Sequence, residues 1–272
     1  KRNLRLGGRS LSNFQSETQY YYLIHNQYLG FRFHGWAKQP QIKTVHHMID
    51  RTLKYVFGEQ SFKTLGCSRT DAMVSAGHFA FELFLHEPLP SRFLKDFNLN
   101  LPPDIRGLKV EEIDGEFNII QNPKTKEYAY LFAHGEKPHP FSAPFITTLP
   151  YSLNIDLMKA GAALFQGQHY FGAYCKKPNE KTILNREIEQ CYIKENDLLT
   201  ANFFPDQSWA MHVVSKGFLR NQVRMMMAQL FRLGKGDITL KYIQDSLKPD
   251  FTEHLSDIAP ASGLMLQQVS FD

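Results

Sequence analysis

The stretch Gln60–Leu85, QSFKTLGCSRTDAMVSAGHFAFELFL, places a short polar loop between two strand-like runs. The first run, Gln60–Leu65, mixes apolar and polar residues, and the second, Gly77–Leu85, is rich in aromatic and branched residues. The loop at residues 69–72, RTDA, sets the carboxylate of Asp71 among small residues. Such a connection can hold an acid at the mouth of a cleft, backed by a rigid sheet. An ordinary turn, in which the loop satisfies its own backbone donors, is the alternative that these four residues alone favour.

Outside this stretch the chain alternates strand-like runs with helical patterns. Thr44 and Asn154 are predicted N-caps of two helices, and Gly58 is the predicted end of the first. Because many connections between strands are too short for helical crossovers, the pattern predicts an α/β (α+β) fold with a mixed, largely antiparallel sheet. Further strands are predicted at residues 20–24, 128–133, 187–193, 209–215 and 264–271, and helices at residues 45–57, 154–165, 218–233 and 239–247.

A proline-rich segment at residues 134–150 is the predicted link between two α/β halves. We expect a basic, flexible N-terminal tail at residues 1–17 and an N-terminal half at residues 18–140, which carries the Asp71 loop. The C-terminal half, residues 141–272, carries a basic helix and a terminal strand.

Composition places the chain among soluble globular proteins, with 43% apolar and 21% charged residues. No apolar run approaches the roughly 20 residues that a membrane-spanning helix needs, and the basic N-terminus lacks the apolar region of a secretory signal. The three cysteines are odd in number and show no CxxC spacing, which is typical of a reducing compartment such as the cytoplasm. Cys67 lies near Asp71, and a small, half-buried thiol is favoured over a nucleophile.

The formal net charge of +4 comes from the first ten residues, which hold four bases and no acid. The remaining chain is balanced, so a polyanion site on it requires local segregation of charge. Two acid-free stretches, Gln207–Gly236 and Thr18–Ile49, carry bases and would suit a phosphate-lined groove. We expect Lys216 and Arg220 in the first of them to bind substrate. The alternative is the ordinary solvated face of an amphipathic helix.

Five blocks of residues resemble, in order, the motifs of one family, the TruA-type tRNA pseudouridine synthases. Among these blocks, Tyr128-x-Tyr130 resembles the family's R-x-Y-x-Y strand, and residues 218–226 resemble its helix pattern FLxHxVRxM. The blocks are Tyr28-x-Gly30 with Phe33-His34-Gly35-Trp36-x-x-Gln39, Arg69-Thr70-Asp71-Ala72 with Val74 and Ala76, Tyr128-x-Tyr130, FLRNQVRMM at 218–226, and Ala259-Pro260-Ala261-Ser262-Gly263-Leu264-x-Leu266.

The resemblance implies a pseudouridine synthase fold of two related α/β halves around a central RNA-binding cleft. It implies an isomerase that converts uridine to pseudouridine in tRNA, at positions 38–40 or nearby in the anticodon stem-loop. Members of this family need no cofactor and no metal, and the bacterial ones are homodimers, so tRNA and a second copy of the chain are the expected partners.

Carried over to the matching positions, Asp71 is implied to be the catalytic carboxylate, and Arg224 its partner. Tyr128 is implied to stack on the target uracil and to assist a proton transfer. Leu264 is implied to lie at the wall of the site, and Arg69 to contact the RNA. From the residues alone, an exposed position on the polar side of a helix is the favoured interpretation of Arg224. For Tyr128 the alternative is a strand tyrosine packed on the core.

The chain departs from the family pattern near these residues. An acid at Glu127, beside Tyr128, would weaken phosphate contacts, so the RNA footprint can differ from that of the family. The departures are Ser68 and Met73 in place of glycine, Ser75 in place of histidine, Glu127 and Ala129 in place of basic residues, and Ala37 in place of glutamine.

The proposed chemistry explains why these residue types are needed together. A carboxylate serves as nucleophile or base only while it is ionised, and burial under a flipped uracil opposes ionisation. A nearby guanidinium favours the charged form, which gives a physical reason for the contact between Asp71 and Arg224 that the resemblance implies. Unstacking a uridine costs a few kcal/mol, and stacking on an aromatic ring returns roughly 1–3 kcal/mol.

Two other classes of function are alternatives to a tRNA-modifying enzyme. A non-catalytic RNA-binding protein on the same scaffold would retain the basic groove without turnover. A small-molecule α/β enzyme has less support, because the chain has no GxGxxG, GxxxxGK[ST] or GxSxG motif.

Overall fold

A nine-stranded sheet runs through the described part of the protein in the computed structural model, which covers residues 20–271. The predicted tail at residues 1–17 lies outside the described residues. The strands are β1 (Tyr20–Tyr28), β2 (Phe62–Gly66), β3 (Ser75–Leu85), β4 (Ile105–Ile113), β5 (Pro123–His134), β6 (Thr147–Leu149), β9 (Gln190–Glu195), β10 (Trp209–Ser215) and β11 (Leu264–Phe271), while β7 (Gly167–Tyr170) and β8 (Asn185–Ile188) form a separate pair.

The sheet has the order β4-β1-β3-β11-β5-β10-β9, with β2 beside β3 and β6 beside β5. Its two halves meet where β11 pairs with β3 in parallel, Met265 opposite Ser75 and Leu266 opposite Ala76. The other neighbours along this order are antiparallel. The predicted mixed, largely antiparallel sheet of an α/β protein is therefore confirmed.

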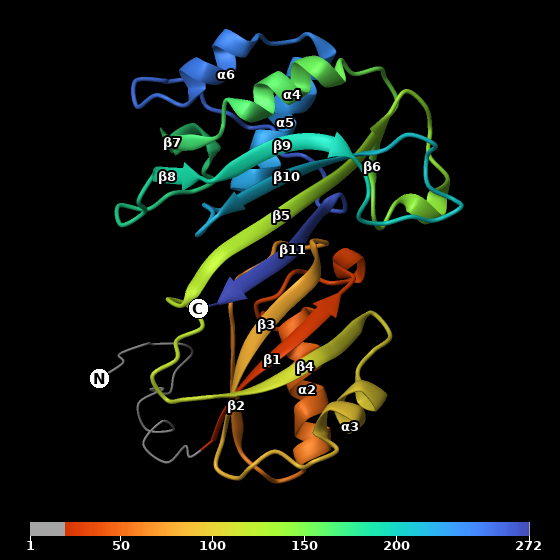
Figure 1. The fold of residues 1–272 in the computed structure, drawn as a ribbon, viewed down its shortest axis with the longest axis vertical. Coiled ribbons are helices and arrows are strands. Elements are labelled where there is room, and N and C mark those ends of the chain that lie inside the picture. Colours follow the sequence, from red (N-terminus) through yellow and green to blue (C-terminus); the bar gives the residue numbers. More distant parts are fainter. Residues whose placement is uncertain (1–19, 272) are drawn as a thin grey trace.

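Helices accompany both halves (Figure 1). The half with β1, β3 and β4 carries α2 and α3, and the half with β5, β9 and β10 carries α4, α5 and α6. The helices are α2 (Val45–Phe57), α3 (Phe93–Asn100), α4 (Ile155–Ala163), α5 (Gln222–Lys235) and α6 (Leu240–Ser246), with 3-10 turns at Gly30–Arg32, Pro140–Ser142 and Gly172–Tyr174. The predicted division at residue 140 stays a prediction, and β5, which precedes it, pairs with β10 and β11.

Local signals account for the helix ends that the sequence predicted. The Thr44 hydroxyl accepts a hydrogen bond from the His47 backbone N–H (3.3 Å), which satisfies a free donor at the start of α2. Gly58 ends the helix with a φ of +62°. Asn154 caps α4 in the same manner, through the Leu157 N–H at 2.9 Å.

Several elements differ from the predictions. The helix expected from residue 218 begins at Gln222, because Asn221 adopts a left-handed backbone conformation (φ +62°). The strand expected at residues 187–193 is divided at Glu189, whose N–H bonds to the Val214 carbonyl instead (2.8 Å). Strand β4 was not predicted, since its sequence, IRGLKVEEI, contains glycine, lysine and glutamate, which are depleted in strands.

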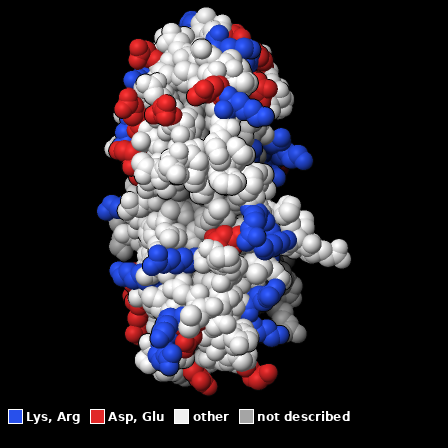
Figure 2. Space-filling view, turned by 90° about the vertical axis from the view of Figure 1, so that its right-hand side faces the viewer, with Lys and Arg blue, Asp and Glu red and all other residues white. Residues whose placement is uncertain are grey.

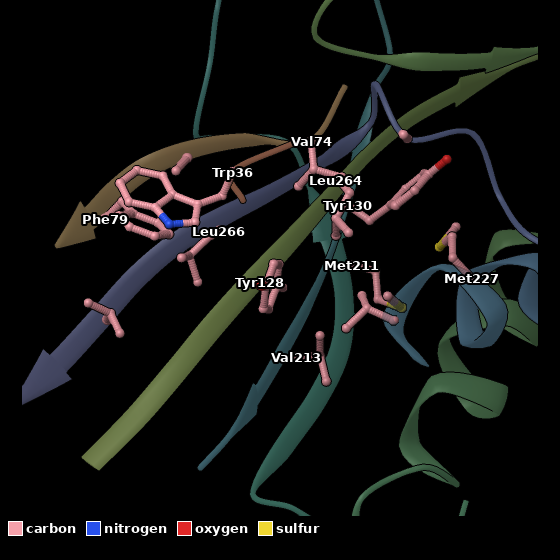
Figure 3. Close-up of a cluster of buried hydrophobic side chains, with 14 of the residues drawn as sticks. Trp36, Val74, Phe79, Tyr128, Tyr130, Met211, Val213, Met227, Leu264 and Leu266 are labelled. Carbon is pink, nitrogen blue, oxygen red and sulfur yellow. The ribbon is translucent and has the colours of Figure 1, made fainter. Parts of the chain in front are cut away.

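One layer of buried side chains crosses the junction of the two halves (Figure 3). Trp36 packs on Phe79 with ring centroids 4.0 Å apart. Beside them, Leu264 and Leu266 on β11 and Tyr128 and Tyr130 on β5 continue the layer. Full burial of such a side chain stabilises the fold by about 1.5–3 kcal/mol. The floor under the Asp71 loop is therefore a shared, rigid core.

Candidate active site

A cleft of about 570 Å³ lies between the Asp71 loop and the start of α5. Tyr128 on β5 and Leu264 on β11 line it, as do Phe218 and Arg224. The structure thus brings together residues from four of the five sequence blocks, which are far apart in the chain. A concave site of this size with few convergent polar groups is typical of ligand binding.

The segment at residues 30–36 braces the Asp71 loop by close backbone contact. The Trp36 N–H donates to the Thr70 carbonyl (3.2 Å), and the Met73 N–H donates to the Phe33 carbonyl (2.9 Å). A Cβ atom on Gly30 would lie only 2.0 Å from the Val74 carbonyl oxygen, and one on Gly35 would lie 2.5 Å from that of Thr70. These two glycines of the first block are therefore required by the position of the second block.

Side chains add to this support. The Tyr28 hydroxyl shares a buried hydrogen bond with the Thr70 hydroxyl (2.9 Å). The Gly30 N–H donates to the Ser75 hydroxyl (2.9 Å), so the serine that replaces the family's histidine ties the end of the loop to the bracing segment. The loop is an over-determined platform and not an ordinary turn.

The carboxylate of Asp71 meets the first turn of α5. Arg224 Nη1 lies 3.5 Å from Asp71 Oδ2, and the Asn221 side-chain amide donates to the same oxygen. The expected proximity of Asp71 and Arg224 is therefore present across 153 positions of sequence. The Asp71 side chain is 36% exposed, against 17% for Arg224. The Asp71 carboxylate is therefore partly accessible from the cleft.

Tyr128 lies deep in the cleft, 7% exposed, with its ring edge-on to Phe218 at 5.2 Å between centroids. Burial raises the pKa of Tyr128 to about 12, against an opposing hydrogen bond with the Ser68 hydroxyl, and the charge of Asp71 contributes a further rise. The phenol therefore keeps its proton at neutral pH. Leu264 is buried beside it, opposite Tyr130 in the strand register.

Lys126 and Cys67 lie at the side of the same cleft. Lys126 is on the Tyr128 face of β5, and its Nζ donates to the Cys67 carbonyl (2.8 Å). Burial lowers the pKa of the Lys126 ammonium. Burial also raises the pKa of the Cys67 thiol to about 11, so the thiol stays protonated and the structural interpretation of this cysteine is the right one.

Glu127 does not face the cleft. Its carboxylate bonds to His212 Nδ1 (2.8 Å), and the His212 ring stacks on Tyr192 with centroids 5.0 Å apart. Because neighbouring strand residues point to opposite faces, this acid lies on the far side of the sheet from Tyr128. The reason for expecting weakened phosphate contacts there is therefore removed.

Bases outnumber acids around the cleft. Asp71 is the one acid among the described residues that line it, against Arg69, Lys126, Arg220 and Arg224. Arg69 and Arg220 are exposed at the rim. Lys216 is exposed one residue outside the lining, next to Gly217. On the face in Figure 2, lysine and arginine side chains are spread across the middle of the molecule around a small acidic patch, and most other acidic side chains lie toward its ends.

Comparison with known proteins places these residues in context. A family profile described as tRNA pseudouridine synthase matches residues 162–272. The tRNA pseudouridine synthase A 2 of Bacillus cereus (strain ATCC 14579) is 30% identical over 252 residues, which cover 92% of this chain and 99% of that protein. The chain belongs to the tRNA pseudouridine synthase family. The tRNA pseudouridine synthase A of Clostridium botulinum (strain Eklund 17B) is 27% identical over 243 residues, which cover 89% of this chain and 96% of that protein. The tRNA pseudouridine synthase A of Clostridium kluyveri is 28% identical over 247 residues, which cover 90% of this chain and 97% of that protein.

The predicted TruA-type synthase, an isomerase, is thus confirmed at the level of the family. Sequence reasoning missed two polar groups in the cleft of this pseudouridine synthase. Asn221 stands at the histidine of the FLxHxVRxM pattern, which is the signal that could have singled it out. Lys126 lies two residues before Tyr128 on a strand, and that spacing puts both on one face. No helix within residues 20–271 is long and apolar enough to cross a membrane.

Proposed function

We propose that this synthase isomerises uridine in the anticodon stem-loop of tRNA, at positions 38–40 or nearby, with Asp71 as the catalytic carboxylate. In this reaction the bond from N1 of uracil to the ribose C1′ breaks, and a bond from C5 to C1′ forms. N1 gains a proton and C5 loses one, so nothing is oxidised. The observation that carries the proposal is the placement of Asp71 as the one acid among the described residues of a basic cleft, beside Arg224.

The other predicted residues receive roles consistent with their positions. Arg224 places a positive charge beside the Asp71 carboxylate, with 3.5 Å between Nη1 and Oδ2. Tyr128 offers a buried ring at the floor of the cleft, suited to stacking on a flipped base. Its bound proton at neutral pH suits it to donate rather than to accept. Leu264 forms the apolar wall.

The rim of the cleft is suited to the RNA backbone. Arg69 and Arg220 line it and Lys216 lies just outside, all exposed. Such contacts release counterions, so tRNA affinity should fall steeply with salt. We further propose that the protein acts in the cytoplasm and that it is a homodimer. Sedimentation at micromolar concentration tests the oligomeric state.

The decisive experiment compares Asp71→Asn with wild type on a pool of tRNA transcripts, with pseudouridine mapped by mass spectrometry. Asp156→Asn is the matched control, because its side chain is 95% exposed on α4. We expect product from wild type and the control, and none from Asp71→Asn. Equal product from all three proteins would overturn the role of Asp71, and none from wild type would favour a non-catalytic RNA-binding protein.

The position of the target needs its own test. Transcripts in which the uridines at positions 38–40 are replaced by cytidine should bind normally and give no product. Pseudouridine elsewhere in such transcripts would show that the anticodon assignment is wrong, while leaving the role of Asp71 intact.

A further inference from the structure

Asn221 donates a side-chain hydrogen bond to Asp71, and its backbone conformation is unusual. It precedes α5 with φ +62° and ψ 8°, the left-handed conformation. Asparagine tolerates this region better than most residues, because its short polar side chain can bond locally. The chain therefore turns sharply at Asn221 before the helix starts, and the turn brings the side chain over the cleft.

The side chain of Asn221 is not used for capping. At a helix start, the side-chain oxygen usually accepts a bond from the second or third helical N–H, yet Asn221 makes no such cap bond. Instead its amide donates to Asp71 Oδ2. The backbone carbonyl of Asn221 still accepts the Met225 N–H (2.9 Å), so the helix itself does not depend on the side chain.

The two donors act on one oxygen. Asn221 Nδ2 and Arg224 Nη1 both approach Oδ2 of Asp71, and among the described residues neither donates to Oδ1. The side chains of Asn221 and Arg224 extend from different points at the start of α5. Together their two hydrogen bonds restrict the orientation of the Asp71 carboxylate. The cleft side of Asp71 remains open.

Resting on the proposed function, we infer that Asn221 is the positioning residue of the catalytic carboxylate. It holds Oδ2 so that Oδ1 is the oxygen presented to the uridine. A hydrogen bond to a charged group is among the stronger ones, and reactive geometry is sensitive to small displacements. The effect should therefore appear in the chemical step and not in tRNA binding.

Two variants separate the hydrogen bond from the backbone turn. Asn221→Gly keeps the left-handed conformation and removes the amide. Asn221→Asp keeps the shape and replaces the donor with a second carboxylate. We expect kcat to fall about 10- to 100-fold in Asn221→Gly and further in Asn221→Asp. KM for tRNA should stay within twofold of wild type and the melting temperature within 2 °C, on the order of what a surface change produces.

The readouts distinguish this inference from the proposed function. If Asp71→Asn is inactive while both Asn221 variants keep kcat within twofold of wild type, the positioning role is wrong and Asp71 stands. A fall in kcat matched by an equal rise in KM, or by a lower melting temperature, would also overturn it in favour of a structural role. If Asp71→Asn is active, the proposed function itself fails.

Discussion

Arg224 and Ala259 hold each other through two hydrogen bonds. The Arg224 Nε–H donates to the Ala259 carbonyl (2.8 Å), and the Ala259 N–H donates to the Arg224 carbonyl (3.1 Å). The first bond fixes the plane of the guanidinium, and the second ties α5 to the segment that leads into β11. With the guanidinium held in this way, its Nη1 donates to Asp71 Oδ2. One side chain thus connects the fourth and fifth sequence blocks to the Asp71 loop.

Arg224→Lys should lower the rate of pseudouridine formation about 10- to 100-fold. A lysine ammonium cannot bond to the Ala259 carbonyl in the plane that a guanidinium offers and also reach Asp71, and a hydrogen bond to a charged group contributes about 1.5–3 kcal/mol. Single-turnover kinetics with saturating enzyme give the rate. The control is Arg232→Lys, which changes a partly exposed arginine on the same helix. Near-normal turnover by Arg224→Lys would mean that the planar geometry of the guanidinium has no role.

Gly30→Ala should damage the site through the backbone. The added Cβ would lie 2.0 Å from the Val74 carbonyl oxygen, so the end of the Asp71 loop must shift. Such overpacking costs about 1–3 kcal/mol of unfolding free energy, and the loss of activity should exceed what the lost stability explains. Denaturant unfolding and initial rates measure the two effects.

Gly115→Ala is the matched control for this change. Its Cβ would lie 3.5 Å from the Tyr21 ring, an ordinary contact outside the cleft. It should therefore keep wild-type stability within about 0.5 kcal/mol. Equal behaviour of the two alanine variants would show that the close approach at Gly30 is relieved without consequence.

Much of the fold could be predicted because its signals are local. The cap at Thr44 and the terminator at Gly58 gave both ends of α2, and the mostly apolar run at Trp209–Ser215 gave β10. β4 had no such signal, because its burial depends on neighbours that lie far away in sequence. The start of α5 was misplaced since a helical pattern does not reveal a single left-handed residue at Asn221.

The contacts of the site likewise fall into those that could be expected and those that depend on the course of the backbone. The contact between Asp71 and Arg224 was expected from the family resemblance, for which chemistry offers a reason, since an acid in an RNA cleft needs a cation. The bond from Asn221 depends on one backbone turn that no composition or spacing specifies. The direction of Glu127 follows from strand alternation once Tyr128 is placed in the cleft. Apart from the Asp71–Arg224 pair, the sequence could not supply the partners of these polar groups, such as His212 for Glu127.

Met73→Gly should stabilise the protein. Met73 has a φ of +66°, where an L-residue with a side chain is strained by roughly 1–2 kcal/mol. Glycine relieves that strain and loses about 0.5–1 kcal/mol of backbone entropy, so a gain of about 0.5–1 kcal/mol is expected. Urea unfolding measures it. Ala72→Gly, a neighbour without a positive φ, should destabilise instead, and a loss of stability in both variants would contradict the strain at Met73.

His46 should make stability fall in mild acid. Its Nε2 bonds to the Thr64 hydroxyl (2.7 Å) and its ring stacks on Trp36 (5.1 Å). Burial lowers the pKa of His46 to about 4, from an ordinary value of 6.5. The unfolded chain therefore binds more protons between these values, so the stabilisation is present above pH 6.5 and is lost as the pH falls toward 4.

Between pH 7.5 and 5 this one residue should remove about 2 kcal/mol from the free energy of unfolding. Denaturant unfolding of wild type and His46→Gln at both pH values isolates the effect, because the other titrating groups cancel in the difference. His47→Gln, which changes the exposed neighbour, should keep the wild-type pH dependence. If His46→Gln loses as much stability in acid as wild type does, His46 accepts a proton in the folded protein as readily as in the unfolded chain.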